Sequence, residues 1–201
     1  MTVTARYSTV AIALHWLIAL LIIGQIAGGF YAENLSHAAR AAPPGDPVRA
    51  QVQEVFQLHK SFGITILVLS LARLFWRLGH KPPPLPAAMP GWEKLAARSV
   101  HVLFYMLMIG APLGGWAIVS TSSFNVPTVI FGLFELPHLP FLSGLEQKED
   151  VHELFEEMHT LAAFSIIGLL VLHVAAAIKH HFVNRDDVLA NMAPILRRKA
   201  G

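Results

Sequence analysis

MHTLAAFSIIGLLVLHVAAAIKHHF, residues 158–182, is the stretch of sequence that decides the fold of this chain. Residues 158–178 contain no Asp, Glu, Lys or Arg, and about 20 apolar residues suffice for a helix to cross a bilayer. His159 and His173 interrupt the apolar run. On a helix these two side chains face nearly the same way and lie about 21 Å apart along the axis. The stretch predicts a membrane helix that carries two histidines at different depths.

The rest of the chain has the composition of a membrane protein. Of its 201 residues, 54% are hydrophobic and only 14% are charged. Three further stretches are long and apolar enough to span a bilayer. We therefore predict an all-α fold, a four-helix transmembrane bundle that forms a single domain over residues 1–201, with helices at approximately 9–31, 56–78, 98–119 and 157–180.

The basic residues predict the orientation of the bundle, because Lys and Arg are enriched in cytoplasmic segments. Eleven lie at the end that carries both termini, and four at the opposite end. Both termini are therefore predicted to be cytoplasmic. The eleven are Arg6, Arg73, Arg77, Lys81, Lys94, Arg98, Lys179, Arg185, Arg197, Arg198 and Lys199, and the four are Arg40, Arg49, Lys60 and Lys148.

The connections are predicted from proline, glycine and charge. Residues 33–54, which contain three prolines, are predicted to form an external loop, and the proline run at 82–84 a stiff cytoplasmic linker. We expect residues 127–142 to lie along the outer membrane interface. The acidic stretch 145–157 is predicted to be an amphipathic lead-in to the last helix.

Depth pairs the histidines across the bundle. The first helix runs outward and the last runs inward, so His15 and His173 lie at one level near the cytoplasmic side. His59 and His159 lie at a second level near the outer side. The last helix therefore supplies one histidine to each of two sites.

Two imidazoles on facing helices are typical axial ligands of a haem iron, and they leave no open position for oxygen. The chain has no Cys, which excludes iron–sulfur clusters and covalent c-type haem attachment. A zinc site needs three or four converging ligands. We predict two non-covalent b haems, with His15, His59, His159 and His173 as the iron ligands.

Several other readings stay open. A single histidine in a membrane helix is more often a hydrogen-bonded core residue than a ligand, although ionisable groups at such depth are functional candidates. His101 could replace His15 as the partner of His173, or contact that haem as a quinone or proton contact. His152 and His180 share the face of His159 and His173, and we predict both to be interfacial.

Three basic residues have roles to assign. Arg73 lies deep enough to pair with a haem propionate, whereas Arg77, one turn later, is predicted to extend to the lipid headgroups. Lys60, beside His59, is the candidate for attracting an anionic substrate to the outer site. Two alternatives stay open for it: holding a propionate of the outer haem, or extending to the lipid headgroups.

Four segments carry a family resemblance: STVAIALHWLIALL (8–21), LHKSFGITILVLSLARLFWRL (58–78), HVLFYMLMIGAPLGGW (101–116) and the opening stretch. Together they resemble the four helices of the bacterial cytochrome b561 family, over nearly the whole chain. The resemblance implies two b haems on the four histidines already named. It also implies a multi-pass protein of the bacterial inner membrane that exchanges electrons with ubiquinone.

The best-defined branch of that family resembles a superoxide oxidase, a superoxide:ubiquinone oxidoreductase. We therefore predict electron transfer from a periplasmic one-electron donor, superoxide, to membrane quinone, with lipid as the surroundings and no nucleic-acid partner. The alternative is a relay subunit that takes electrons from a periplasmic redox protein or dehydrogenase, which the acidic outer segments favour. A third reading is a transporter without haem, whose histidines line a water-filled pathway.

Overall fold

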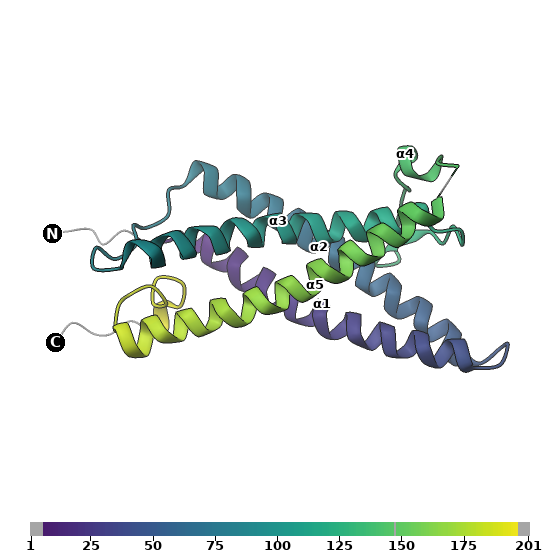
Figure 1. The fold of residues 1–201 in the computed structure, drawn as a ribbon, viewed down its shortest axis with the longest axis horizontal. Helices are drawn as coiled ribbons and strands as arrows, with labels where there is room; N and C mark the ends of the chain where they lie inside the picture. The colour runs from purple at the N-terminus through teal and green to yellow at the C-terminus, as the bar shows by residue number, and fades with distance from the viewer. Residues whose placement is uncertain (1–5, 147, 197–201) are drawn as a thin grey trace.

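The structure is a computed structural model that describes residues 6–146 and 148–196. Four long helices run side by side along the molecule (Figure 1), and each is long and apolar enough to cross a membrane. The predicted four-helix bundle is confirmed. The four helices are α1 (Thr9–Ala41), α2 (Pro47–Gly79), α3 (Gly91–Thr121) and α5 (Lys148–Lys179).

Both described chain ends lie at the same end of the bundle, which we call the terminal end (residues 6–8, 80–90 and 180–196). The opposite end, the hairpin end, holds residues 42–46 and 122–146 (Figure 1). The cytoplasmic orientation of the terminal end stays a prediction. Three of the basic residues on which it rests, Arg197, Arg198 and Lys199, lie outside the described residues.

The helices continue well past the predicted apolar spans, and the expected external loop at residues 33–54 was wrong. α1 continues to Ala41 and α2 begins at Pro47, so only residues 42–46 connect them. The reason is local. No proline or glycine interrupts residues 33–41, and the Asp46 carboxylate caps α2 by accepting a hydrogen bond from the Val48 amide at 2.9 Å. Proline at the first helical position completes that start.

The hairpin end contains two short strands that the sequence had not revealed. β1 (Thr128–Ile130) pairs antiparallel with β2 (Phe134–Leu136). The turn between them uses positive φ at Phe131 (48°) and Gly132 (74°), which glycine adopts readily. A single turn of helix, α4 (Pro140–Ser143), follows before α5. The predicted interface segment 127–142 is therefore a small folded cap on the bundle.

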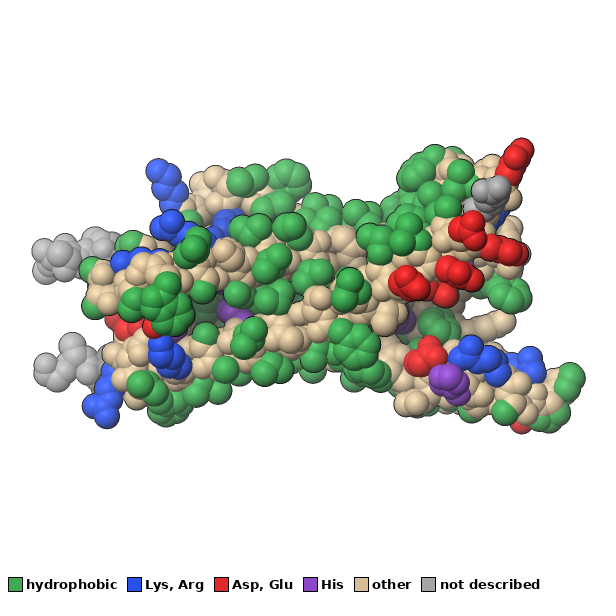
Figure 2. Space-filling view, in the orientation of Figure 1, with side chains coloured by type: hydrophobic (Ala, Val, Ile, Leu, Met, Phe, Trp, Pro, Cys, Tyr) green, Lys and Arg blue, Asp and Glu red, His purple; other side chains and the backbone are tan. Residues whose placement is uncertain are grey.

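Side chains from all four long helices form one apolar core. α1 packs on α2, α2 on α3 and α3 on α5, whereas α1 and α5 approach one another closely at few points. Large apolar side chains also cover the outside of the bundle (Figure 2), as the hydrocarbon of a bilayer requires. The core residues are Ile18, Ile22, Ile66, Met108, Ala111 and Ile166.

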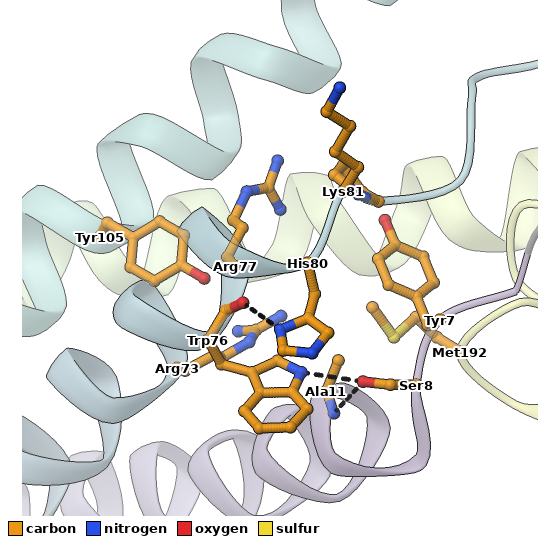
Figure 3. A pocket seen from close by; sticks show the side chains of 11 residues that line it. Tyr7, Ser8, Ala11, Arg73, Trp76, Arg77, His80, Lys81, Tyr105 and Met192 are labelled. Atoms are coloured by element: carbon orange, nitrogen blue, oxygen red, sulfur yellow. Dashed lines mark hydrogen bonds between the residues drawn. The ribbon is translucent and has the colours of Figure 1, made fainter.

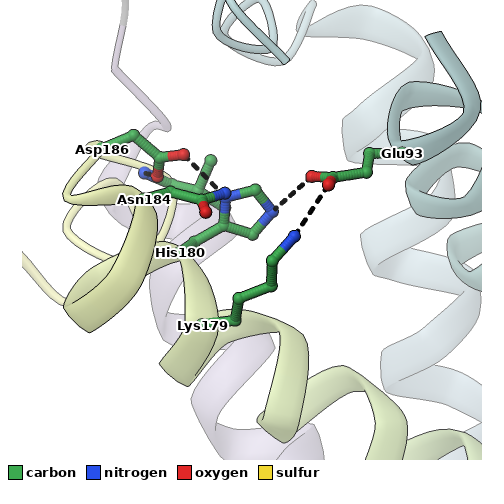
Figure 4. A network of polar contacts seen from close by, with 6 residues as sticks. Glu93, Lys179, His180, Asn184 and Asp186 are labelled. Atoms are coloured by element: carbon green, nitrogen blue, oxygen red, sulfur yellow. Dashed lines mark hydrogen bonds and ion pairs between the residues drawn. The ribbon is translucent and has the colours of Figure 1, made fainter. Parts of the chain in front are cut away.

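Polar contacts tie the start of α3 to the end of α5 at the terminal end (Figure 4). The Glu93 carboxylate pairs with the Lys179 ammonium at 2.7 Å, and the His180 ring bonds to the Asp186 carboxylate at 2.6 Å. His180 opens a π-helical turn, η1 (His180–Asn184), and is buried. A short 3-10 helix, η2 (Pro194–Leu196), follows.

Candidate haem-binding sites

The bundle brings the histidines together in the two pairs that depth had indicated. The ring centroids of His15 and His173 lie 6.1 Å apart, and those of His59 and His159 lie 6.3 Å apart. α5 supplies His159 to the pair at the hairpin end and His173 to the pair at the terminal end. All four rings are half-buried among the helices.

The spacing of the rings fits a haem iron. A bond from a metal to an imidazole nitrogen is about 2 Å long, so two rings on opposite sides of one iron have centroids roughly 6 Å apart. Among residues 6–146 and 148–196, no group of three or more His, Cys, Asp or Glu side chains converges as a metal site. The arrangement is thus one of paired ligands, as haem requires.

In the pair at the hairpin end, a hydrogen bond fixes the orientation of the His159 ring. Its Nδ1 lies 2.9 Å from the carbonyl oxygen of Ala111 on α3, to which it donates its proton. The other ring nitrogen, Nε2, is then free to bind iron, and the carbonyl fixes the plane of the ring. A β-carbon added at Gly115 would lie 3.4 Å from Cε1 of His159, so this glycine admits the ring.

His59, the partner in that pair, has fewer constraints. Its Nδ1 is buried and has no hydrogen-bond partner in the described chain. A β-carbon added at Gly29 would lie 3.3 Å from Cε1 of His59, so a glycine again lies against the ring. The Gln25 amide donates to the His59 carbonyl at 2.6 Å and ties α1 to α2 at this level.

The pair at the terminal end has a third histidine beside it. The His101 ring on α3 lies 5.8 Å from that of His173, slightly closer than the His15 ring. The geometry therefore allows either His15 or His101 to stand opposite His173, as the sequence had left open.

Arg73 lies at this level, in contact with His15. Its Nη2 donates to Nδ1 of His15 at 3.1 Å, and its guanidinium lies 5.8 Å from the centroid of the Tyr105 ring. A neutral His15 that accepts at Nδ1 carries its proton on Nε2. Iron ligation by that nitrogen requires Arg73 to release the ring, and a carboxylate such as a haem propionate is the partner that a guanidinium prefers.

Lys60 follows His59 in the chain and hydrogen-bonds to the cap at the hairpin end, residues 127–142. Its ammonium donates to the Pro127 carbonyl at 3.2 Å. Gln57 donates to the same carbonyl at 2.7 Å and accepts from the Val129 amide at 3.1 Å, and the Ser61 hydroxyl accepts from the Phe131 amide at 3.0 Å. Sequence reasoning missed Gln57 and Ser61; their spacing of four residues at the start of a span was the available signal.

The two remaining candidate histidines make other contacts. His152 hydrogen-bonds with the Thr121 hydroxyl at 3.1 Å and pairs with Glu156 at 3.2 Å. His180 belongs to the network in Figure 4 and is buried within the protein. Neither ring pairs with the ring of His159 or His173.

Sequence comparison places this architecture among known proteins. The profile of prokaryotic cytochrome b561 matches residues 6–194. The chain belongs to the prokaryotic cytochrome b561 family. Cytochrome b561 homolog 2 of Escherichia coli (strain K12) is 31% identical over 188 residues, which cover 93% of this chain and 90% of that protein. A protein of Yersinia pestis named "Probable superoxide oxidase CybB" is 31% identical over 190 residues, covering 94% of this chain and 96% of that protein.

A second Escherichia coli relative, cytochrome b561 homolog 1, is 25% identical over 198 residues, which cover 96% of this chain and 99% of its own. Membership of the cytochrome b561 family makes the chain a membrane cytochrome of electron transport that binds haem b. The paired histidines are the side chains of this cytochrome that fit the group.

Proposed function

We propose that this cytochrome b561 binds two b haems and carries electrons between a one-electron donor at the hairpin end and quinone in the membrane. The ligand pairs are His59–His159 at the hairpin end and His15–His173 at the terminal end. The observation that carries the proposal is that α5 places one ring in each of two pairs with centroids 6.3 and 6.1 Å apart. When bound, a b haem supplies reversible one-electron transfer.

The protein side chains hold and tune the two sites. Each histidine pair would hold one haem through two imidazoles, which would leave no position for oxygen, so the haem would supply electron transfer. The Ala111 carbonyl keeps the His159 proton on Nδ1, and hydrogen bonds of this kind raise the basicity of the ligand. Arg73 is the residue that would hold a propionate at the terminal end. The apolar helices exclude water and lower the local dielectric.

Superoxide is the proposed donor, and ubiquinone the proposed acceptor. The Yersinia pestis relative carries the name of a superoxide oxidase. Lys60 is the cation nearest in sequence to His59, and a positive charge at a site mouth steers an anion towards it. We assign Lys60 this steering role, in addition to its bond to Pro127. On this proposal the hairpin end faces the periplasm of a bacterial inner membrane and both termini face the cytoplasm.

A redox protein docked at the hairpin end is the second candidate donor. Acidic side chains gather over the start of α5 at this end (Figure 2), and all six are exposed. Such a surface attracts a basic partner and repels an anion. The six are Glu146, Glu149, Asp150, Glu153, Glu156 and Glu157.

The visible spectrum of the purified protein tests the haem assignment. We expect two low-spin b haems per chain in the reduced-minus-oxidised spectrum. His59→Ala and His159→Ala should each remove the same haem, and His15→Ala and His173→Ala the other. His101→Ala should keep both haems. If His101→Ala lost the terminal-end haem and His15→Ala kept it, His101 would be the ligand in place of His15. A colourless protein would favour the transporter reading.

A kinetic measurement separates the two donors. With superoxide as donor, Lys60→Gln should slow haem reduction and flatten its dependence on ionic strength, whereas the matched variant Lys148→Gln should not. Equal rates in both variants would contradict steering by Lys60. Co-purification of a basic redox partner that reduces the haem faster than superoxide would favour the relay subunit.

A further inference from the structure

A small cation-rich pocket lies at the terminal end, apart from the paired histidines. It opens between the residues before α1, the last turns of α2 and the middle of α3 (Figure 3). Its volume is about 30 Å³. We call it the basic pocket, and its polar lining residues are Tyr7, Ser8, Arg73, Trp76, Arg77, His80, Lys81 and Tyr105.

Within residues 6–146 and 148–196, the positive charge of the basic pocket has no counter-charge at ion-pairing distance. In the described part of the chain, no carboxylate lies within ion-pairing distance of Arg73, Arg77 or Lys81. No Asp or Glu lines the pocket either. Burial raises the pKa of Tyr7, so this phenol keeps its proton and can donate it. Three cations and a neutral donor around one cavity form a site for an anion.

The pocket lies where the apolar surface of α2 ends. Phe75 and Leu78, on either side of its lining residues, are 68% and 74% exposed, as lipid-facing side chains are. α2 ends at Gly79, and Lys81 lies two residues beyond this end. Trp76 stacks on His80 with ring centroids 4.0 Å apart. Amphipathic aromatic side chains of this kind are typical of the membrane interface. The depth is that of the lipid headgroups.

We propose that the basic pocket binds the phosphate of an anionic phospholipid. A phosphate presents several oxygens to the guanidinium of Arg77 and the ammonium of Lys81, and these are its usual protein partners. A cavity of about 30 Å³ has room for roughly two waters, which suits the oxygens of one phosphate but not a soluble nucleotide. The glycerol and acyl chains stay outside, along the apolar surface of α2.

The haem is not the natural occupant of the outer part of this pocket. Arg73 contacts His15 and belongs to the level of the histidines. Arg77 lies one helical turn, about 6 Å, farther out, and Lys81 follows beyond the end of the helix. A b haem has two propionates, so Arg73 can hold one of them while Arg77 and Lys81 serve a second anion. The haem content of the double variant then distinguishes a lipid phosphate from the other propionate.

Lipid titration of the purified holoprotein tests the proposal. Phosphatidylglycerol is added to the protein in detergent, and bound lipid is counted by intact-protein mass spectrometry, with zwitterionic phosphatidylcholine as the reference lipid. The doubly substituted chain carries Arg77→Gln and Lys81→Gln; the matched control is Arg98→Gln, an exposed basic residue outside the pocket. Each near-surface cation contributes roughly fivefold to affinity for anionic lipid.

We expect one phosphatidylglycerol per chain in the native protein, binding roughly thirtyfold weaker in the double variant, and unchanged binding in Arg98→Gln. Haem content and the visible spectrum should stay the same in all three proteins. Three results would overturn the proposal. The first is phosphatidylglycerol binding in the double variant as tight as in the native protein, and the second is displacement of phosphatidylglycerol by millimolar inorganic phosphate alone. The third is loss of haem from the double variant, which would mean that Arg77 and Lys81 bind the haem.

Discussion

Substitution of Gly115 by alanine tests how closely α3 approaches His159, the proposed haem ligand on α5. The added β-carbon would lie 3.4 Å from Cε1 and 3.6 Å from Nδ1 of His159. The ring cannot turn away freely, because its Nδ1 is held 2.9 Å from the Ala111 carbonyl. The neighbouring Gly114 is the matched control, since a β-carbon there meets nothing within 4 Å.

Two opposing effects set the magnitude. Replacing glycine by alanine inside a helix stabilises it by about 0.5–1 kcal/mol. At 3.4 Å the added β-carbon lies at the edge of ordinary van der Waals contact, so the overpacking cost is at the low end of the usual range, about 1 kcal/mol. We therefore expect Gly114→Ala to be more stable than the native protein, and Gly115→Ala to be less stable than Gly114→Ala by about 1 kcal/mol. For a chain of this length, each kcal/mol corresponds to a shift in melting temperature of about 2–4 °C.

The assay is thermal unfolding of the purified holoprotein, followed at the haem absorption band. The reduced spectrum provides a second readout, because, on the proposed ligation, displacement of His159 would alter the ligand field of one haem and leave the other unchanged. Equal melting temperatures and identical spectra for Gly115→Ala and Gly114→Ala would refute the reasoning. They would mean that the close approach places no constraint on the ring.

Three further predictions concern contacts that hold the bundle together. Glu93→Gln removes the carboxylate that pairs with Lys179. Because Lys179 is 45% exposed, we expect the free energy of unfolding to fall by only about 1 kcal/mol. The melting temperature should be lower than that of the exposed-site control Glu149→Gln. Gln57→Ala removes two hydrogen bonds to the cap, so amide hydrogen exchange in residues 127–136 should become faster by roughly tenfold or more. Gln53 lines the same surface, and Gln53→Ala should leave the exchange rate unchanged. Asp46→Ala should destabilise the protein by about 1 kcal/mol through loss of the α2 cap, and Asp46→Asn should restore it; no difference between the two would contradict the capping role.

The number of helices and the level of each histidine were both predictable from the sequence. Apolar runs long enough to span a bilayer are local features, and the 14-residue separation of His159 and His173 fixes their depths on any helix. Since residues at one depth on neighbouring helices come close together, the two histidine pairs followed. The lengths of α1 and α2 did not follow from hydropathy, because helix caps and the absence of breakers decide where a helix ends in water.

Other features depended on contacts between distant segments. The rotation of each helix about its axis determines that both His15 and His101 approach His173, and a pattern of apolar residues specifies that rotation only coarsely. The β1–β2 cap rests on hydrogen bonds to Gln57 and Ser61, about seventy residues earlier in the chain. The basic pocket likewise forms only where the residues before α1 meet the end of α2 and the middle of α3.

By itself, the sequence determined a four-helix membrane protein with histidines at two depths, because length, hydropathy and depth are properties of each helix alone. Only the tertiary structure decided which glycine admits a ring, which carbonyl orients His159, and which cations remain without a counter-charge. These features are set by distances of a few ångströms between helices. Such distances come from the packing of the whole bundle and leave no periodic trace in the sequence.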